Sequence, residues 1–419
     1  MQIIQASNRA ALDRLASRDE ARDPAVERQA ARIIDDVRRR GDAAVADWTK
    51  KLDGRTVGKK ILPVSGAELR KGWAATPLEV RRALRIAATN LERVSAKQKP
   101  RGFVVNVAPG LTIEQRVQAL TRVGCYVPGG RYPLPSTLLM TVVPARVAGV
   151  TETIVMCPRP APVVLAAALE AGATQVFAIG GAQAVAALAY GTASIPRVDK
   201  IVGPGNAWVT AAKALVSADC SIDLHAGPSE IVVASDEGDP DWIAADLIAQ
   251  AEHDPAARAI LVTTKKRLAD AVAREIDRQM PEDGPAAVSL ARNGAIIMAR
   301  TKREAVELVN QLAPEHLVVD EGANVGAFKT AGTIFVGRWS AQASGDYCTG
   351  SNHVLPTGGA GRFRGGLGAA DFVRVFNVQR IGRRGIERIG PSAVALADAE
   401  GLSGHAASIR KRLTRGRPS

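Results

Sequence analysis

The chain has 419 residues, which is too long for one simple core, so we expect two or more domains. Hydrophobic residues make up 46% and charged residues 23%, a composition typical of a soluble globular protein. The net charge of +13 could suit a nucleic-acid binder, but no nucleic-acid motif and no interleaving of basic with aromatic residues accompanies it, so we expect no nucleic-acid partner.

The sequence shows no sign of export or of membrane insertion. The first residues, MQIIQASNRAALDR, contain no apolar segment, and no run of about 18 apolar residues follows. The four cysteines form no CxxC pair, so neither a thiolate zinc site nor a disulfide framework is indicated. We therefore expect a cytoplasmic protein with reduced thiols and no membrane partner.

Residues 8–50 are predicted to be helical, and VERQAARIIDDVRRRGD ends at Gly41, a helix-stop signal. Residues 78–98, LEVRRALRIAATNLERVSAKQ, predict another long helix. These helices are charged on one face, which is typical of an outer layer. Strand-like apolar runs then alternate with Ala-rich helices, first between residues 124 and 216 and again between 229 and 337. This alternation predicts βαβ units with parallel sheets, arranged as two Rossmann-like halves.

Two predicted strand-to-helix junctions contain glycines, AIGGAQAV at 178–185 and KIVGPGNAWV at 200–209. Backbone N–H groups at such a helix start favour phosphate. Neither junction is a GxGxxG, so plain tight turns explain them equally well. Residues 341–370 are rich in Gly, Ser and Asn, which indicates a functional loop. The basic end, IRKRLTRGRPS, is either a solvated terminus or an attractor of anionic ligands such as dinucleotide phosphates.

Gln250 and His253 stand at i, i+3 on a predicted helix that Pro255 ends. Nitrogen and oxygen donors without thiolates suit Zn²⁺, Mn²⁺ or Co²⁺, and one ion could reach both side chains. Glutamine is a poor ligand, so the site would need a carboxylate and a second imidazole. The alternative is that His253 caps the carbonyl groups at the helix end.

Glu315 and His316 are adjacent and follow a predicted helix and Pro314. A histidine and a partly buried glutamate can serve two proton transfers at different points of a reaction. Without further context, a surface glutamate beside a structural histidine explains the pair as well.

A series of motifs in a fixed order resembles the histidinol dehydrogenase family, zinc-dependent enzymes that complete histidine biosynthesis. The motifs are YVPGGRYPLPSTLLM, GGAQAVAALAYGT, VGPGNAWVTAAK, DLHAGPSEIVV, AADLIAQAEHDP, LAPEHL, SGDYCTGSNHVLPT and EGLSGHAASIR. The resemblance runs from about residue 20 to about residue 412. It implies oxidation of L-histidinol through L-histidinal to L-histidine, with two NAD used in sequence at one site.

The resemblance also implies the roles of particular residues. His316 would take the alcohol proton, and Glu315 would activate the water that attacks the aldehyde. The zinc ligands, one ion per subunit, would be Gln250, His253, Asp346 and His405. The substrate, held partly through these ligands and His316, would also contact Ser229, His353 and Glu400. NAD would contact Tyr126, Gln183 and Asn206.

The implied fold is α/β, with two Rossmann-like, incompletely doubly wound domains, N-terminal helices and a small C-terminal segment that swaps in a homodimer with shared active sites. We expect an N-terminal helical segment at 1–20 and a main domain with zinc and catalytic residues at 21–124 plus 229–370. An NAD-binding domain is expected at 125–228, and a dimer-crossing segment with a basic tail at 371–419.

Three features depart from the family pattern or lie outside it. His225 is not among the family's functional residues and is expected to be structural or at the rim. Residues 96–120 match only loosely, so the entrance to the cofactor cleft could differ, and the tail beyond Lys411 has no assigned role. Two alternatives stay open: a related zinc- and NAD-dependent dehydrogenase of another amino alcohol or diol, and a basic nucleic-acid-binding or scaffold protein.

Overall fold

The structure is a computed structural model that describes residues 1–16, 23–58, 60–130, 132–224 and 227–414, so His225 lies outside the described residues. It forms two compact units. Unit 1 comprises Met1–Gln98 and Leu120–Phe372, and unit 2 comprises Lys99–Ala119 and the chain from Val373 onward. Each unit is described by itself.

A five-stranded parallel sheet forms one half of unit 1. Its strands lie in the order β6 (Gln175–Phe177), β5 (Glu152–Met156), β4 (Arg122–Tyr126), β7 (Lys200–Val202) and β8 (Ser221–Ile222). Counted along the chain, this is the order 3-2-1-4-5 that doubly wound sheets use. The strands are short apolar runs because helices cover both faces and leave no side of the sheet to solvent.

Helices cover the five-stranded sheet in two layers on each face. On one face lie α6 (Pro135–Ala148) and α7 (Pro162–Ala171), with α4 (Gly66–Ala75) and α5 (Leu78–Gln98) outside them. On the other face lie α8 (Gly181–Tyr190) and α9 (Ala207–Val216), with α2 (Pro24–Arg40) and α3 (Asp42–Asp53) outside them. As predicted, α2 ends at Gly41, where φ is 58°.

The placement of the N-terminal helices differs from the prediction. We expected residues 21–124 to belong with 229–370, yet Ile33 and Val37 of α2 share one core with Val185 of α8 and Val209 of α9. The amphipathic pattern of α2 shows which of its faces is buried. It does not say which of two sheets buries that face.

A six-stranded parallel sheet forms the other half of unit 1. Its strands lie in the order β1 (Gln2–Gln5), β11 (Ala295–Met298), β10 (Arg258–Thr263), β9 (Glu230–Ala234), β12 (His316–Val319) and β13 (Thr333–Val336). From β11 to β13 this sheet repeats the order 3-2-1-4-5. The N-terminal helical segment expected at 1–20 contains the helix α1, but it begins with strand β1, because Gln2–Gln5 pairs in parallel with β11.

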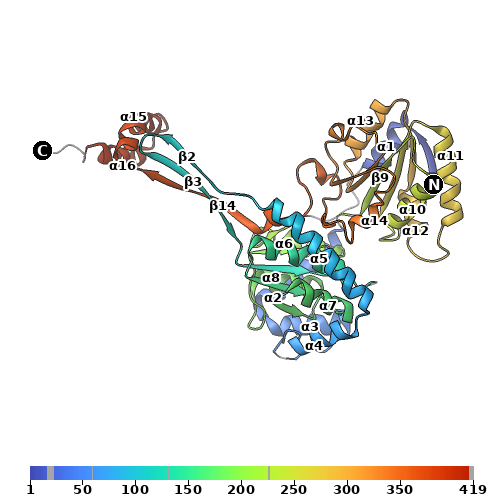
Figure 1. Ribbon diagram of the computed structural model, residues 1–419. Coiled ribbons are helices and arrows are strands. Elements are labelled where there is room, and N and C mark those ends of the chain that lie inside the picture. Colours follow the sequence, from blue (N-terminus) through green and yellow to red (C-terminus); the bar gives the residue numbers. More distant parts are fainter. Residues whose placement is uncertain (17–22, 59, 131, 225–226, 415–419) are drawn as a thin grey trace. The chain divides into compact units, whose positions relative to one another are not determined.

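Helices also cover both faces of the six-stranded sheet. One core packs α10 (Pro240–Ala251), α11 (Lys266–Gln279) and α12 (Ala286–Asn293) on it, and the other packs α1 (Arg9–Ala16) and α13 (Lys302–Leu312) (Figure 1). The two sheets confirm the predicted α/β class with parallel strands. Segment 320–372 holds only short helices, η2 (Val325–Ala327), α14 (Gln342–Gly345), η3 (Ala360–Arg362) and η4 (Ala369–Phe372), besides β13.

Unit 2 is an antiparallel ribbon with two helices at one end (Figure 1). Its strands lie in the order β14 (Val373–Ile381), β3 (Leu111–Ala119) and β2 (Phe103–Ala108), followed in sequence by α15 (Arg383–Ala399) and α16 (Ser403–Thr414). The C-terminal segment was predicted as residues 371–419 alone. In the structure, residues 99–119 belong to the same unit, because β14 pairs along its whole length with β3. Among the helices described, none is long and apolar enough to cross a membrane.

Candidate active site

The turn that precedes β12 positions Glu315 and His316. Helix α13 ends at Leu312, and its C-cap Ala313 is the one described non-glycine residue with a positive φ (49°). Such strain in a non-glycine residue is often found next to functional groups. The turn delivers Glu315 beside the neighbouring parallel strand β9, where its Oε2 accepts hydrogen bonds from Ser229 Oγ (2.6 Å) and Glu230 N (2.9 Å).

Glu315 and His316 are both buried, at 5% and 3% exposure. Burial raises the pKa of Glu315, while the positive charge of His316 and the two hydrogen bonds oppose that rise. Burial by itself would lower the pKa of His316, but the negative charges of Glu315 and Asp346 outweigh it and raise that pKa. His316 Nδ1 lies 3.2 Å from Glu230 O and 3.6 Å from Glu315 Oε2.

Asp346 stands on the other side of His316 and links it to His353. Asp346 Oδ1 lies 3.7 Å from His316 Nε2, and the Asp346 carbonyl oxygen lies 3.0 Å from His353 Nδ1. His353 Nε2 also contacts Thr137 Oγ1 of α6 at 3.1 Å. Burial raises the pKa of Asp346, but His316, His353 and His253 together lower it by more, so the net shift is downward. Burial lowers the pKa of His353, which favours its neutral form.

Gln250, in the last turn of α10, supplies an unusual buried amide. It has 0% exposure, and within the described part of the chain neither its Oε1 nor its Nε2 has a hydrogen-bond partner. Helix α10 ends at Ala251, so His253 lies in the turn beyond the helix rather than on it. His253 is nevertheless close enough for its charge to act on Asp346 and His353.

The carboxyl edge of the five-stranded sheet gathers the three residues predicted to contact NAD. Tyr126 ends β4, Gln183 lies in the first turn of α8, and Asn206 is the N-cap of α9. Tyr126 is 4% exposed and its hydroxyl oxygen accepts a hydrogen bond from Gly181 N at 3.1 Å. Gln183 has 0% exposure, and among the described residues nothing pairs with either of its amide atoms.

The predictions did not include the buried ion pair Lys213–Asp223 at this edge. Lys213 Nζ contacts Asp223 Oδ1 and donates to the Gly203 carbonyl oxygen at 2.8 Å, while Gly203 N donates to Asp223 Oδ2 at 2.6 Å. Gly203 has φ of 111°, and a Cβ there would lie 2.1 Å from Tyr126 O, so only glycine fits. The sequence does hint at this pair, because Lys213 and Asp223 are charged residues within the mostly apolar stretches AWVTAAKALV and SIDL.

Glu400 and His405 belong to unit 2. Glu400 is the C-cap of α15 and His405 lies in the first turn of α16, and both side chains are exposed. Unit 1 therefore holds Gln250, His253 and Asp346 of the predicted metal ligands. Among the described residues, no group of three or more His, Cys, Asp or Glu side chains could hold a metal ion.

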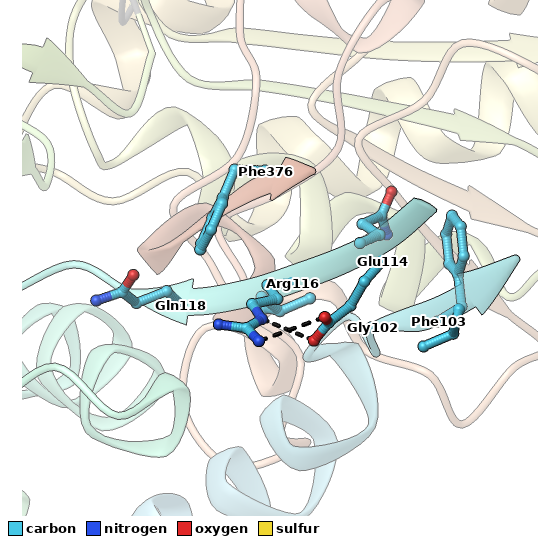
Figure 2. Close-up of a pocket in the computed structure, with 9 residues that line it drawn as sticks. Gly102, Phe103, Glu114, Arg116, Gln118 and Phe376 are labelled. Atoms are coloured by element: carbon cyan, nitrogen blue, oxygen red, sulfur yellow. Dashed lines mark hydrogen bonds and ion pairs between the residues drawn. The ribbon is translucent and has the colours of Figure 1, made fainter. Parts of the chain in front are cut away.

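Unit 2 also carries a hollow of about 530 Å³ on its sheet (Figure 2). It is lined by Gly102, Phe103, Val104, Glu114, Gln115, Arg116, Val117, Gln118 and Phe376. Two of these lining residues, Glu114 and Arg116 of β3, form an ion pair at 2.7 Å (Figure 2). None of the predicted catalytic, metal or cofactor residues lines it, so it is distinct from the candidate active site.

Comparison with known proteins identifies the family. The profile of the family described as histidinol dehydrogenase matches residues 16–413. Histidinol dehydrogenase of Rhizobium meliloti (strain 1021) is 46% identical over 92% of this chain and 91% of its own length. That of Dechloromonas aromatica (strain RCB) is 43% identical over 98% of each chain. The crystal structure of histidinol dehydrogenase from Elizabethkingia anophelis superimposes with a TM-score of 0.93 at 30% identity, covering 99% of this chain and 98% of the other. The chain is therefore a member of the histidinol dehydrogenase family of oxidoreductases.

Proposed function

We propose that this protein oxidises L-histidinol to L-histidine through L-histidinal, with two NAD used in sequence. The observation that carries the proposal is the buried pair Glu315–His316, flanked by Ser229 on one side and Asp346 on the other. Two oxidations at one carbon need two bases that act at different times, and this pair offers them in one place. The family match over residues 16–413 supplies the substrate class.

His316 is assigned as the base of the first oxidation. It takes the hydroxyl proton while the alcohol carbon loses a hydride, which yields the aldehyde. To accept that proton, His316 must be neutral, although Glu315 and Asp346 raise its pKa. The rate of the first oxidation should therefore rise with pH as His316 loses its proton, and level off above its raised pKa.

Glu315 is assigned as the base of the hydration that precedes the second oxidation. It takes a proton from water as the oxygen attacks the aldehyde carbon, and the resulting diol loses a hydride and a proton to give the acid. The hydrogen bonds from Ser229 and Glu230 favour its ionised form against the effect of burial. Ser229, His353 and Glu400 are the assigned substrate contacts.

The residues present fit the cofactors that the family resemblance implies. Gln250, His253 and Asp346, with His405, are assigned to zinc; the buried amide of Gln250 is the supporting observation, since such a group usually has a partner. Tyr126, Gln183 and Asn206 are assigned to NAD, supported by the similarly unpartnered amide of Gln183 at the edge where doubly wound sheets bind nucleotides. When bound, zinc would supply a Lewis acid for the nitrogen atoms of the substrate, and NAD would supply the hydride acceptor.

A homodimer with shared sites completes the proposal. Unit 2 exposes many large apolar side chains for its size, more than a surface in water usually keeps. They are Phe103, Val104, Val105, Val107, Val375, Ile381, Leu396 and Leu402. A three-stranded ribbon with so little buried surface needs a partner, and a second subunit would cover it. In that dimer, Glu400 and His405 would serve the partner's site.

Counting NADH against histidinol tests the proposal. The expected result is two NADH for each histidinol consumed, loss of turnover after chelation, and recovery when zinc is restored. The product of the full reaction should be histidine. One NADH per alcohol, or turnover of other amino alcohols or diols in preference to histidinol, would instead support the related dehydrogenase. No dehydrogenase activity together with salt-dependent DNA binding would support the basic nucleic-acid-binding protein.

A further inference from the structure

The end of helix α3 at Asp53, together with Arg55 just beyond it, is hydrogen-bonded to the carboxyl edge of the five-stranded sheet. The Arg55 guanidinium donates to the carbonyl oxygens of Pro158 and Ala178, the latter at 2.9 Å, just beyond β5 and β6. The Arg159 guanidinium donates in return to the Asp53 carbonyl oxygen at 3.2 Å. All three hydrogen bonds are accepted by backbone carbonyl oxygens, so none of them uses the Asp53 carboxylate.

The Asp53 carboxylate lies beside the proposed dinucleotide site. The side chain is half-buried, and within the described part of the chain its enclosed Oδ2 has no hydrogen-bond partner. Burial raises the pKa of Tyr126 to about 12, and the negative charge of Asp53 adds to that rise. Tyr126 in turn contacts Gly181, at the start of α8.

The residues that directly follow β5 leave the choice of cofactor open. In doubly wound folds, the residue that reads the adenosine ribose commonly follows the second strand along the chain. An acid there accepts from the 2′-hydroxyl, whereas an arginine accommodates a 2′-phosphate. Here the second strand is β5, and Cys157, Pro158 and Arg159 follow it, so this strand end offers a cation and no acid.

We propose that Asp53 accepts hydrogen bonds from the adenosine ribose hydroxyls and selects NAD over its 2′-phosphorylated form. The inference rests on the proposed function, in which NAD binds at this edge. A carboxylate is a good acceptor for a ribose diol, whereas a 2′-phosphate there would meet a like charge. Arg159 exerts the opposite, weaker preference, because its guanidinium is engaged by the Asp53 carbonyl oxygen.

The test is a comparison of Kd for NADH and NADPH, measured by ligand fluorescence on full-length variants. Asp53→Ala should weaken NADH binding about tenfold and lower the ratio of the NADPH Kd to the NADH Kd by about a hundredfold. Asp53→Asn, which keeps the shape and one acceptor but loses the charge, should give a smaller change of the same sign. Arg159→Ala should raise that ratio several-fold with little effect on NADH.

Asp47→Asn is the matched control, since Asp47 lies on the same helix with 67% of its side chain exposed. It should leave the ratio unchanged. An unchanged ratio in both Asp53 variants, at melting temperatures equal to that of the parent, overturns the role of Asp53 while histidinol turnover with NAD stands. A parent protein that binds neither dinucleotide overturns the NAD proposal, and this inference with it.

Discussion

The two parallel sheets of unit 1 have the same strand order but place their candidate residues at opposite edges. In the five-stranded sheet, Tyr126 is the last residue of β4, and Gln183 and Asn206 follow the carboxyl ends of β6 and β7. Ser229 and Glu315 directly precede the amino ends of β9 and β12 in the six-stranded sheet. Open α/β sheets usually bind ligands outside the carboxyl ends, where the strand order reverses. Under the proposed function, the six-stranded sheet therefore departs from the rule, and the side chains at its carboxyl edge offer a reason.

The two sheets carry different chemical groups at the point where their strand order reverses. In the five-stranded sheet it lies between β4 and β7, beside the glycine turn at Gly203. In the six-stranded sheet it lies between β9 and β12, where Asp320 accepts from Ser235 Oγ and from Asp236 N at 2.9 Å. Asp236 accepts from Thr264 N at 2.7 Å. These carboxylates occupy the backbone N–H groups that a phosphate would need and add negative charge. Strand order alone thus does not decide where a ligand binds.

The largest expected effect comes from replacing the two proposed bases at the amino edge of the six-stranded sheet. His316→Gln and Glu315→Gln should each lower kcat by about a hundredfold to ten-thousandfold, because each removes a positioned proton acceptor. His316→Gln should also abolish the rise of the rate with pH that the raised pKa of His316 predicts. The Kd for NADH should stay within about twofold, since NAD is assigned to the other sheet. Stopped-flow turnover and fluorescence titration measure the two quantities.

Glu304→Gln is the control for these variants, because Glu304 lies in the first turn of α13, at the carboxyl edge of the six-stranded sheet, and is paired there with Arg300 at 2.8 Å. It should leave both kcat and Kd unchanged. A rise in the NADH Kd of His316→Gln as large as its loss in kcat would contradict the separation of the two edges.

The two buried glutamines give the second comparison. Gln250→Leu and Gln183→Leu should each raise the free energy of unfolding of the ligand-free protein by about 1–3 kcal/mol, because each removes a buried amide that has no partner. Their binding losses should differ: Gln250→Leu should lose zinc, and Gln183→Leu should raise the NADH Kd about tenfold. Urea denaturation, metal analysis and fluorescence titration measure these outcomes.

Gln279→Leu is the control, since Gln279 is half-buried and its Nε2 donates to Asp241 O at 3.0 Å. It should lower stability slightly and change neither ligand. If Gln250→Leu or Gln183→Leu destabilised the ligand-free protein, the amide would contribute to folding stability, and its lack of a partner would no longer support a role in ligand binding.

The sequence predicted the α/β class and the alternating units because buried parallel strands are apolar runs that their helices separate. It missed β1, which at Gln2–Gln5 is too short to stand out beside the helical pattern that follows. It also missed the pairing of residues 99–119 with the C-terminal segment, since register between distant antiparallel strands depends on tertiary contacts. The adjacency of Glu315 and His316 could be read directly. The pairing of Lys213 with Asp223 could not be predicted in this way, because ten residues separate the two and the pair forms only in the folded chain.

The smallest expected effect is the difference between removing two N-cap side chains, one at the carboxyl edge of each sheet. Asn206 Oδ1 accepts from Val209 N at 3.1 Å at the start of α9, and Thr301 Oγ1 accepts from Glu304 N at 3.1 Å at the start of α13. Asn206→Ala and Thr301→Ala should each lower the free energy of unfolding by about 1 kcal/mol, because each leaves a helix N–H without its acceptor. Only Asn206→Ala should also raise the NADH Kd, because only α9 starts beside the proposed NAD site. Asn206→Asp should restore stability yet bind NADH more weakly still, since its charge opposes the pyrophosphate. Equal effects of Asn206→Ala and Thr301→Ala on NADH would mean that the α9 cap acts through stability alone, and the contrast between the two carboxyl edges would then rest on Tyr126 and Gln183.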